Sequence, residues 1–156
     1  IHYLNPKLVV GCIVESRDTI LLCRRSIAPR AGYWTLPAGF MENGESTADA
    51  ARRETIEEAC ARVDIRQPFA MVSIPHINQV HLFYRARLLD GHYAAGLETL
   101  EAKFFAEEDI PWTDIAFLSV TRCLEAYFAD RKNGSFRFHD DEIRRPPRRP
   151  SPSATV

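Results

Sequence analysis

The stretch GFMENGESTADAARRETIEEAC, residues 39–60, carries most of the information about how this chain folds. A glycine-containing loop leads directly into a helix that carries three carboxylates, Glu54, Glu57 and Glu58, within about one turn. Side chains three or four residues apart share a helix face, and like charges at that spacing repel by roughly 0.2–0.5 kcal/mol per pair. The stretch is therefore either a solvated helix face or a place where a positive charge lies among the acids.

The start of this helix has a clear signal. Ser46 can cap it, and Asp49 follows three residues later as an acidic capping-box partner. The residues expected to form the apolar stripe are Ala50, Ile56, Ala59, Cys60 and Val63.

The rest of the chain alternates between strand-like and helix-like patterns. Strands are expected at 7–16, 18–26, 69–74, 79–89 and 102–109, a second amphipathic helix at 120–131, and loops at 27–34 and 34–45. This order predicts an α/β (α+β) fold in which a mixed sheet packs between helices. One domain over 1–143 is expected, followed by a disordered Arg- and Pro-rich tail over 144–156.

The bulk composition excludes several classes of protein. The 156 residues suit a single domain, and a net charge of −1 gives no field that favours nucleic acid or an anionic membrane. No apolar run approaches the ~20 residues of a membrane span. The cysteines form no CxxC pair, so we expect free buried thiols in a reducing cytoplasm at Cys12, Cys23, Cys60 and Cys123.

The spacing of the charged residues in 39–60 resembles the Nudix box, Gly-x5-Glu-x7-Arg-Glu-apolar-x-Glu-Glu-x-Gly. The fixed positions that match are Gly39, Glu45, Arg53, Glu54, Glu57 and Glu58. The resemblance implies a Nudix fold and a hydrolase that holds Mg²⁺ or Mn²⁺. The cation would remove the mutual repulsion of the acids.

The match departs from the box at two positions. Thr55 stands where an apolar residue is usual, and Cys60 stands where the box has glycine. That glycine commonly closes the helix in a left-handed conformation, which other residues adopt reluctantly. We therefore expect the helix to run on toward Val63.

Further segments are similar to a Nudix subfamily that acts on FAD, ADP-ribose and NADH. They are GYWTLPAGFMENGE at 32–45, PHINQV at 75–80 and EAKFF at 101–105. Many members carry an N-terminal zinc ribbon, whose cysteines this sequence lacks. The resemblance implies Mg²⁺-dependent hydrolysis of the pyrophosphate bond of a nucleoside diphosphate linked to another group. A housecleaning nucleoside-triphosphate pyrophosphatase and a non-catalytic nucleotide-sensing module are the alternatives.

The resemblance also implies roles for individual residues. Arg53 and Glu45 would orient the acids, and Glu54 and Glu57 are both candidates for the base that deprotonates water. The implied metal ligands are Glu54, Glu57, Glu58, the backbone carbonyl near Gly39, and an acid from a downstream loop, for which Glu98 is preferred over Glu101.

Substrate contacts are expected mainly outside the box, and 67–80 corresponds to the stretch that shapes the nucleotide pocket in related enzymes. Tyr33 and Phe69 are candidates for stacking on a base, and Arg24, Arg25 and Arg30 for contacting phosphates.

Three further residues are expected to have structural roles, and the partners follow from the resemblance and the charge. We expect His76 and His81 to be structural, and Trp34 to belong to the core. The expected partner is a small-molecule nucleotide, neither a membrane nor a nucleic acid, and family members are often homodimers.

Overall fold

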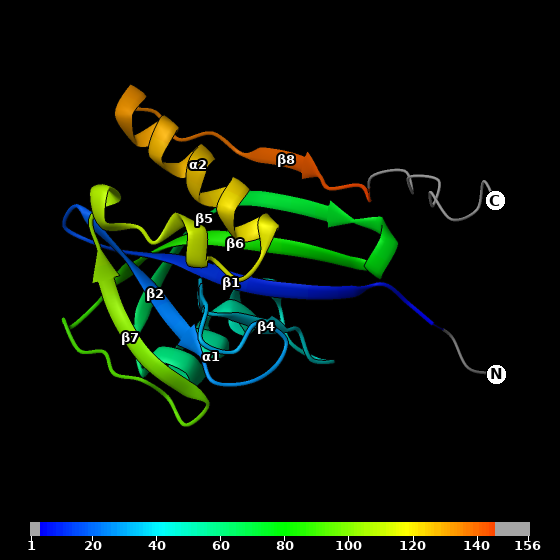
Figure 1. Cartoon of the computed structure of the whole chain (residues 1–156), viewed down its shortest axis with the longest axis horizontal. Coiled ribbons are helices and arrows are strands. Elements are labelled where there is room, and N and C mark those ends of the chain that lie inside the picture. The colour runs from blue at the N-terminus through cyan, green and yellow to red at the C-terminus, as the bar shows by residue number, and fades with distance from the viewer. Residues whose placement is uncertain (1–3, 146–156) are drawn as a thin grey trace, which may run out of the picture.

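The computed structural model describes residues 4–145 and consists of three layers (Figure 1). A mixed eight-stranded sheet lies in the middle, with one long helix packed on each face. The expected α/β layer fold is therefore confirmed.

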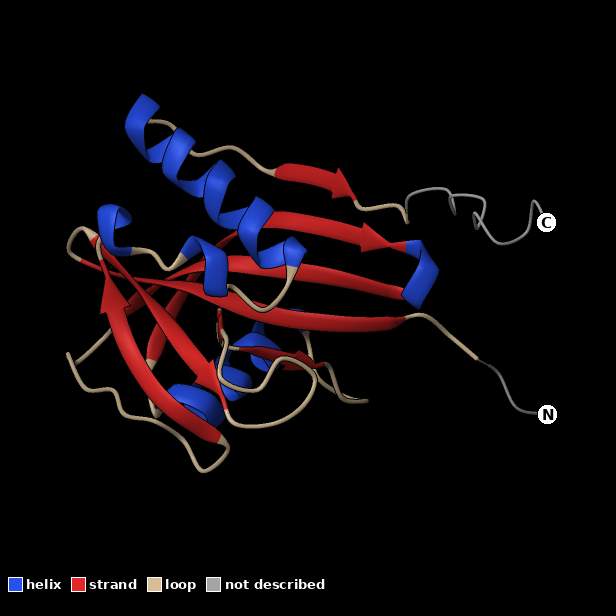
Figure 2. Cartoon of the chain, in the orientation of Figure 1, coloured by secondary structure: helices blue, strands red, loops and turns tan. Residues whose placement is uncertain are grey.

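Figure 2 distinguishes the helices from the strands by colour, and the colour scale of Figure 1 gives their order along the chain. The helices are α1 (Thr47–Ala59) and α2 (Leu118–Asn133), with short 3-10 turns at η1 (Pro75–Ile77), η2 (Glu107–Asp109) and η3 (Trp112–Asp114). The strands are β1 (Lys7–Ser16), β2 (Thr19–Arg25), β3 (Trp34–Thr35), β4 (Ala38–Phe40), β5 (Val63–Ile74), β6 (Gln79–Leu88), β7 (Thr99–Phe105) and β8 (His139–Glu142).

Strand β1 organises the sheet because it pairs with three other strands. It runs parallel to β6 along most of its length, pairs antiparallel with β4 near its start, and meets β2 at its end. The main path is β3-β2-β1-β6-β5-β8, and β7 pairs with the free side of β2. Strand β4 thus reaches the sheet next to the first half of β1.

Alternation along the strands divides the core between the two helices. In β1, Val10, Cys12 and Val14 pack toward α1, whereas Ile13 belongs to the cluster under α2. Successive strand residues point to opposite faces of a sheet, so an almost entirely apolar strand serves both layers.

The boundaries differ from expectation in places where pairing outweighs local propensity. The loop expected at 34–45 contains β3 and β4, whose two and three residues are held by β2 and β1. Strand β7 lies at 99–105 instead of 102–109, and β5 begins at 63 instead of 69. Strand β8 was not expected because its sequence, HDDE, has little strand propensity.

The end of the described chain returns to the sheet edge. The Asp130 carboxylate on α2 accepts hydrogen bonds from the Arg137 amide (3.0 Å) and from His139 Nε2 (2.8 Å), which ties β8 to the helix. Arg144 and Arg145 follow β8 without regular structure, and 146–156 lie outside the described residues. Among residues 4–145, no helix is both long enough and apolar enough to span a membrane.

Candidate active site

Helix α1 begins as the sequence indicates. The Ser46 hydroxyl accepts a hydrogen bond from the Asp49 amide (3.0 Å), which confirms the predicted cap. The residues that α1 buries are Ala50, Ala51, Thr55 and Ala59. Three of these are alanines, so the helix backbone can lie close to the sheet, and the Cys12 thiol contacts the Ala51 carbonyl at 3.7 Å.

The prediction for the apolar stripe of α1 is wrong at Ile56. Ile56 is 47% exposed, and Thr55 is fully buried in its place. The Thr55 hydroxyl donates to the Ala51 carbonyl one turn earlier (2.7 Å), so the departure from the box leaves no polar atom unpaired.

The end of α1 corrects a second expectation. The helix stops at Ala59, and Cys60 adopts the left-handed conformation (φ 49°) with its amide bonded to the Ile56 carbonyl. Cysteine therefore closes the helix as glycine would, and the expected extension toward Val63 is wrong. Cys60 is also exposed, whereas the other three cysteines are buried as expected.

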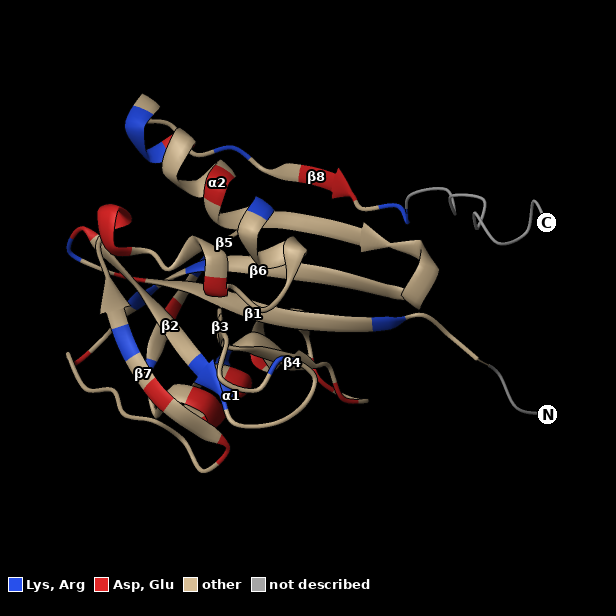
Figure 3. Cartoon of the chain, viewed as in Figure 1, with Lys and Arg blue, Asp and Glu red and all other residues tan. Residues whose placement is uncertain are grey.

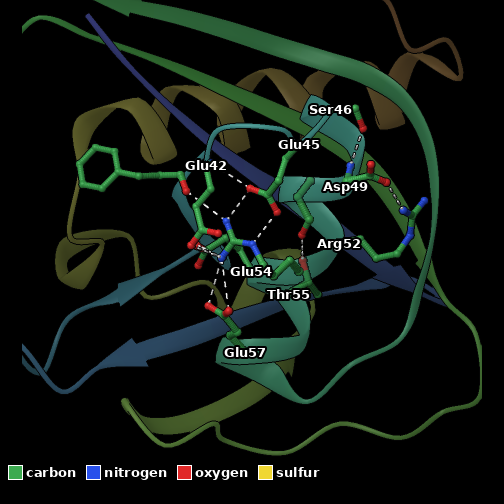
Figure 4. A network of polar contacts seen from close by, with 11 residues as sticks. Glu42, Glu45, Ser46, Asp49, Arg52, Glu54, Thr55 and Glu57 are labelled. Atoms are coloured by element: carbon green, nitrogen blue, oxygen red, sulfur yellow. Dashed lines mark hydrogen bonds and ion pairs between the residues drawn. The ribbon is translucent and has the colours of Figure 1, made fainter. Parts of the chain in front are cut away.

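The Arg53 guanidinium bonds to several acids, of which Figure 4 labels Glu45, Glu54 and Glu57. It forms a two-pronged bond with Glu45 (2.6 and 2.9 Å) and contacts Glu54 at 2.9 Å and Glu57 at 3.3 Å. It also donates to the Phe40 carbonyl on β4 (3.1 Å). One cation thus links three carboxylates to β4, and the orienting role implied for Arg53 and Glu45 stays a prediction.

Gly39 leaves room for one of these acids. A Cβ atom added at Gly39 would lie 2.2 Å from the Glu54 carboxyl carbon, so any side chain there would displace Glu54. Burial raises the pKa of the Glu54 carboxyl, and the Arg53 guanidinium opposes that rise. The glycine at the start of the motif is thus explained by a close approach of β4 to α1.

Glu58 bonds to the backbone of β4, whereas Glu54 and Glu57 bond to Arg53. Its Oε2 accepts a hydrogen bond from the Ala38 amide on β4 (3.2 Å). Burial raises its pKa to about 8, despite the opposing effects of that hydrogen bond and the Arg25 guanidinium. A partly buried carboxylate with a raised pKa is favoured in its ionised form by a cation nearby.

A loop before β7 packs against the end of α1. The Ala94 amide donates to the Ala59 carbonyl (2.9 Å), and the Gly96 amide donates to the Glu58 carbonyl (3.0 Å). A Cβ atom at Gly96 would lie 1.9 Å from the Glu57 carbonyl oxygen. The loop therefore satisfies two helix-end carbonyls and is held where only glycine fits.

This loop brings Glu98 toward the acids of α1. Glu98 and Glu58 line the same small polar cavity of about 50 Å³, together with Arg24, Arg25 and Thr35. Glu101 lies within β7, where it pairs with Arg24 in the ladder, and does not line this cavity. The geometry thus favours Glu98 over Glu101 as the downstream acid.

The acids fit a hard cation by chemistry, although they do not form a ready cage. Across residues 4–145, no three His, Cys, Asp or Glu side chains converge in the manner of a metal site. Arg53 lies between Glu54 and Glu57, and Glu58 is turned toward Ala38. Carboxylate and carbonyl oxygens are nevertheless the donors that Mg²⁺ and Mn²⁺ take, with water completing the shell.

A large cavity of about 670 Å³ adjoins this cluster, and most of its wall is apolar. It lies between the β1-β6 half of the sheet, β4 and the start of α2. Its lining residues include Val9, Leu36, Phe83, Phe117 and Val120 from the core side, and Arg25, Ala38 and Gly39 from the side of the acids. Strand β4 therefore contacts the acids and also lines the cavity.

The five candidate substrate residues separate into three groups. Arg25 lines both cavities, and Arg24 lines only the polar one. Arg30 and Tyr33 line neither and stack on each other at 5.2 Å. Phe69 is 1% exposed and packs against Tyr127 in the core, so its predicted role in base stacking is wrong.

The ends of β2 and α1 bring opposite charges together. Figure 3 shows the basic end of β2 close to acidic residues of α1 and β7. Arg25 is fixed there, because its Nε donates to the Pro29 carbonyl (2.8 Å) and its guanidinium lies 4.9 Å from the centre of the Phe117 ring. It therefore stands at the boundary between the acids and the large cavity.

The sequence predicts only part of the cavity wall. The stretch 67–80 was identified, and Ile74, His76, Ile77 and Gln79 do line the cavity. Phe117 and Ser119 at the start of α2 were not identified, because no local motif marks them and only the topology brings them to β6.

Comparisons with known proteins agree with this geometry. The NUDIX domain model matches residues 5–143. The ADP-ribose pyrophosphatase of Methanocaldococcus jannaschii is 30% identical over 115 residues, covering 70% of this chain and 67% of that protein. The NAD-capped RNA hydrolase NudC of Pseudomonas syringae pv. tomato is 31% identical over 132 residues, covering 82% of this chain but only 45% of that protein.

A solved structure is more similar than either of these relatives. The crystal structure of a NUDIX hydrolase from Nitrosomonas europaea superposes with a TM-score of 0.90 at 51% identity, and covers 92% of this chain and 82% of that one. With the family model spanning most of the chain and the acids gathered around Arg53, the chain belongs to the NUDIX family of hydrolases.

Proposed function

We propose that this protein is a Mg²⁺-dependent (or Mn²⁺-dependent) pyrophosphatase that cleaves a nucleoside diphosphate linked to another group. ADP-ribose, NADH and FAD are the first candidate substrates. The observation that carries the proposal is the shared boundary of the two cavities, where Ala38, Gly39 and Arg25 adjoin both the acids and the large apolar space. An anionic pyrophosphate and an apolar nucleobase need neighbouring sites of these two kinds.

Members of this family typically use a divalent metal ion. Here Glu54, Glu57, Glu58, Glu98 and a carbonyl near Gly39 would hold it. Bound Mg²⁺ or Mn²⁺ would neutralise phosphate charge and lower the pKa of a coordinated water.

The chain's own residues supply orientation and proton transfer. Arg53 and Glu45 hold the acids in place, and Arg25 donates hydrogen bonds to a phosphate. Glu54 or Glu57 takes the proton of the attacking water, whose oxygen forms a new bond to one phosphorus as the bridging P–O bond breaks. For ADP-ribose the products would be AMP and ribose 5-phosphate.

The test is a hydrolysis screen with Mg²⁺, with Mn²⁺ and with EDTA, over ADP-ribose, NADH, FAD, NAD⁺ and the dNTPs. Chromatography of the products distinguishes the two hydrolase functions, because a triphosphate yields inorganic pyrophosphate and a linked diphosphate does not. Turnover of the dNTPs alone would favour the housecleaning alternative, and binding without turnover would favour a sensing module.

A matched pair of variants tests the acids. Glu57→Gln should abolish turnover with the fold intact, whereas Glu125→Gln, the same change at an exposed position on α2, should leave turnover unchanged. Near wild-type rates for Glu57→Gln at saturating Mg²⁺ would contradict the assignment. A homodimer and a cytoplasmic location stay predictions, which gel filtration and fractionation would test.

A further inference from the structure

The apolar cavity contains one connected set of polar side chains. His81 Nδ1 lies 2.7 Å from the Ser119 hydroxyl, and His81 Nε2 lies 2.8 Å from Gln79 Oε1. All three residues line the cavity, Gln79 and His81 from β6 and Ser119 from the start of α2. We refer to Gln79, His81 and Ser119 as the polar chain.

Burial keeps the imidazole of the polar chain uncharged. Ser119 is 1% exposed and His81 is 8% exposed. Burial lowers the pKa of His81, so its imidazole is neutral near pH 7, with one ring nitrogen donating and the other accepting.

The neutral imidazole couples the hydrogen-bonding roles of Gln79 and Ser119, the two ends of the polar chain. If His81 Nε2 donates to the Gln79 carbonyl, Nδ1 accepts from the Ser119 hydroxyl. The Gln79 amide group is then free to donate and the Ser119 oxygen is free to accept. If the proton moves to Nδ1 and the Gln79 amide turns over, the Gln79 carbonyl becomes free to accept and the Ser119 hydroxyl free to donate, so in either arrangement one end of the chain can donate while the other accepts.

We propose that the polar chain determines specificity by hydrogen bonding to the polar edge of the substrate's nucleobase, while the apolar wall contacts its faces. Every nucleobase presents neighbouring donors and acceptors on its pairing edge and an apolar face on each side. The phenylalanine rings of the wall are Phe40, Phe83 and Phe117. This inference rests on the proposed function for its substrate class, and it replaces the purely structural role expected for His81.

Geometry separates base recognition from the chemistry. The polar chain lies on β6 and α2, whereas every acid proposed to bind the metal lies on α1 or on the loop before β7. Removing an end of the chain should therefore alter which base is preferred without altering the hydrolysis of a substrate that has no base.

The test compares Ser119→Ala and Gln79→Met with Thr121→Ala, which removes a hydroxyl from the same helix at a position that does not line the cavity. Binding of AMP, GMP, UMP and CMP is measured by calorimetry in EDTA, where no turnover is needed. Hydrolysis is measured with ADP-ribose, GDP-mannose and UDP-glucose, and with 5-phosphoribosyl 1-pyrophosphate as a pyrophosphate that carries no base.

The wild type should bind one mononucleotide at least 5-fold more tightly than another. Each cavity variant should reduce that ratio, and should lower kcat/KM for the preferred substrate about 10-fold or more, mainly through KM, because a lost hydrogen bond leaves a polar base atom unpaired. Hydrolysis of the base-free substrate should change less than 2-fold, and Thr121→Ala should match the wild type.

Two results would overturn the inference: unchanged base ratios in both cavity variants, or an equal loss with the base-free substrate. Selective binding that both variants abolish, in a protein that hydrolyses nothing in the screen, would refute the proposed function while supporting base recognition. Turnover of the linked diphosphates with base ratios that the variants leave unchanged would support the proposed function and refute base recognition by the polar chain.

Discussion

Replacing Arg53 by methionine is expected to destabilise the metal-free protein far more than replacing its neighbour Arg52. Both residues are arginines on α1, and both contact acids. They differ in surroundings: the Arg53 side chain is 24% exposed among Glu45 and Glu54, which are 17% and 12% exposed, whereas Arg52 and Asp49 are 44% and 63% exposed.

The magnitude follows from these exposures. Removing one partner of a buried pair costs roughly 3–5 kcal/mol, because the other charge is left unpaired. Partial exposure reduces the value here, and the contact with Glu57, which is 56% exposed, adds little. We expect Arg53→Met to lower the free energy of unfolding by about 2–3 kcal/mol, and Arg52→Met by less than about 0.5 kcal/mol.

Thermal unfolding in EDTA, followed by circular dichroism, measures the difference. In a domain of this size 1 kcal/mol corresponds to about 2–4 °C in Tm, so Arg53→Met should unfold roughly 4–12 °C earlier than the wild type. Millimolar Mg²⁺ should recover part of that loss, and NaCl at equal ionic strength should recover less. Equal Tm values for the two variants would refute the view that Arg53 compensates the charges of the acids.

Three further outcomes follow from the geometry of the site. Arg25→Met should lower kcat/KM about 10–100-fold through loss of a charge-assisted contact to phosphate, and an unchanged value, or an equal loss in Arg30→Met, would contradict its placement. Gly96→Ala should lower both Tm and turnover, because its Cβ would meet the Glu57 carbonyl at 1.9 Å, and full activity would show that the loop can move away. Burial raises the pKa of Glu58 to about 8, so the stability that this group contributes in EDTA is greatest below about pH 4.5 and is lost as the pH rises through 8. The loss is at most about 1.4 kcal/mol per pH unit. Glu58→Gln should therefore flatten the change in Tm between pH 6 and 8.5.

The sequence was most informative where chemistry fixes both residue type and spacing. The cap at Ser46 and the acids on α1 were predicted from spacing alone, and the apolar strand at 7–16 was predicted at its observed limits. Such features depend on neighbours within a few residues, which a sequence reveals directly.

The errors occur where distant segments decide the outcome. Phe69 has an aromatic ring that could stack on a base, but on β5 its side chain packs in the core under α2. Cys60 adopts a left-handed conformation that its residue type disfavours, because the loop at Ala94 and Gly96 bonds to the last carbonyls of α1. Strand β8 is polar, and only its pairing with β5 and its bond to α2 make it a strand.

The short strand β4 has a thermodynamic consequence for the whole protein. Its Ala38 amide and Gly39 backbone contact two of the acids, and the same two residues line the cavity proposed for the base. A ligand that shifts β4 must therefore change the affinity for the cation, and by reciprocity the cation must change the affinity for the ligand by the same factor. Nucleotide titrations with and without Mg²⁺ would give that factor directly, as a coupling free energy transmitted through three residues of backbone.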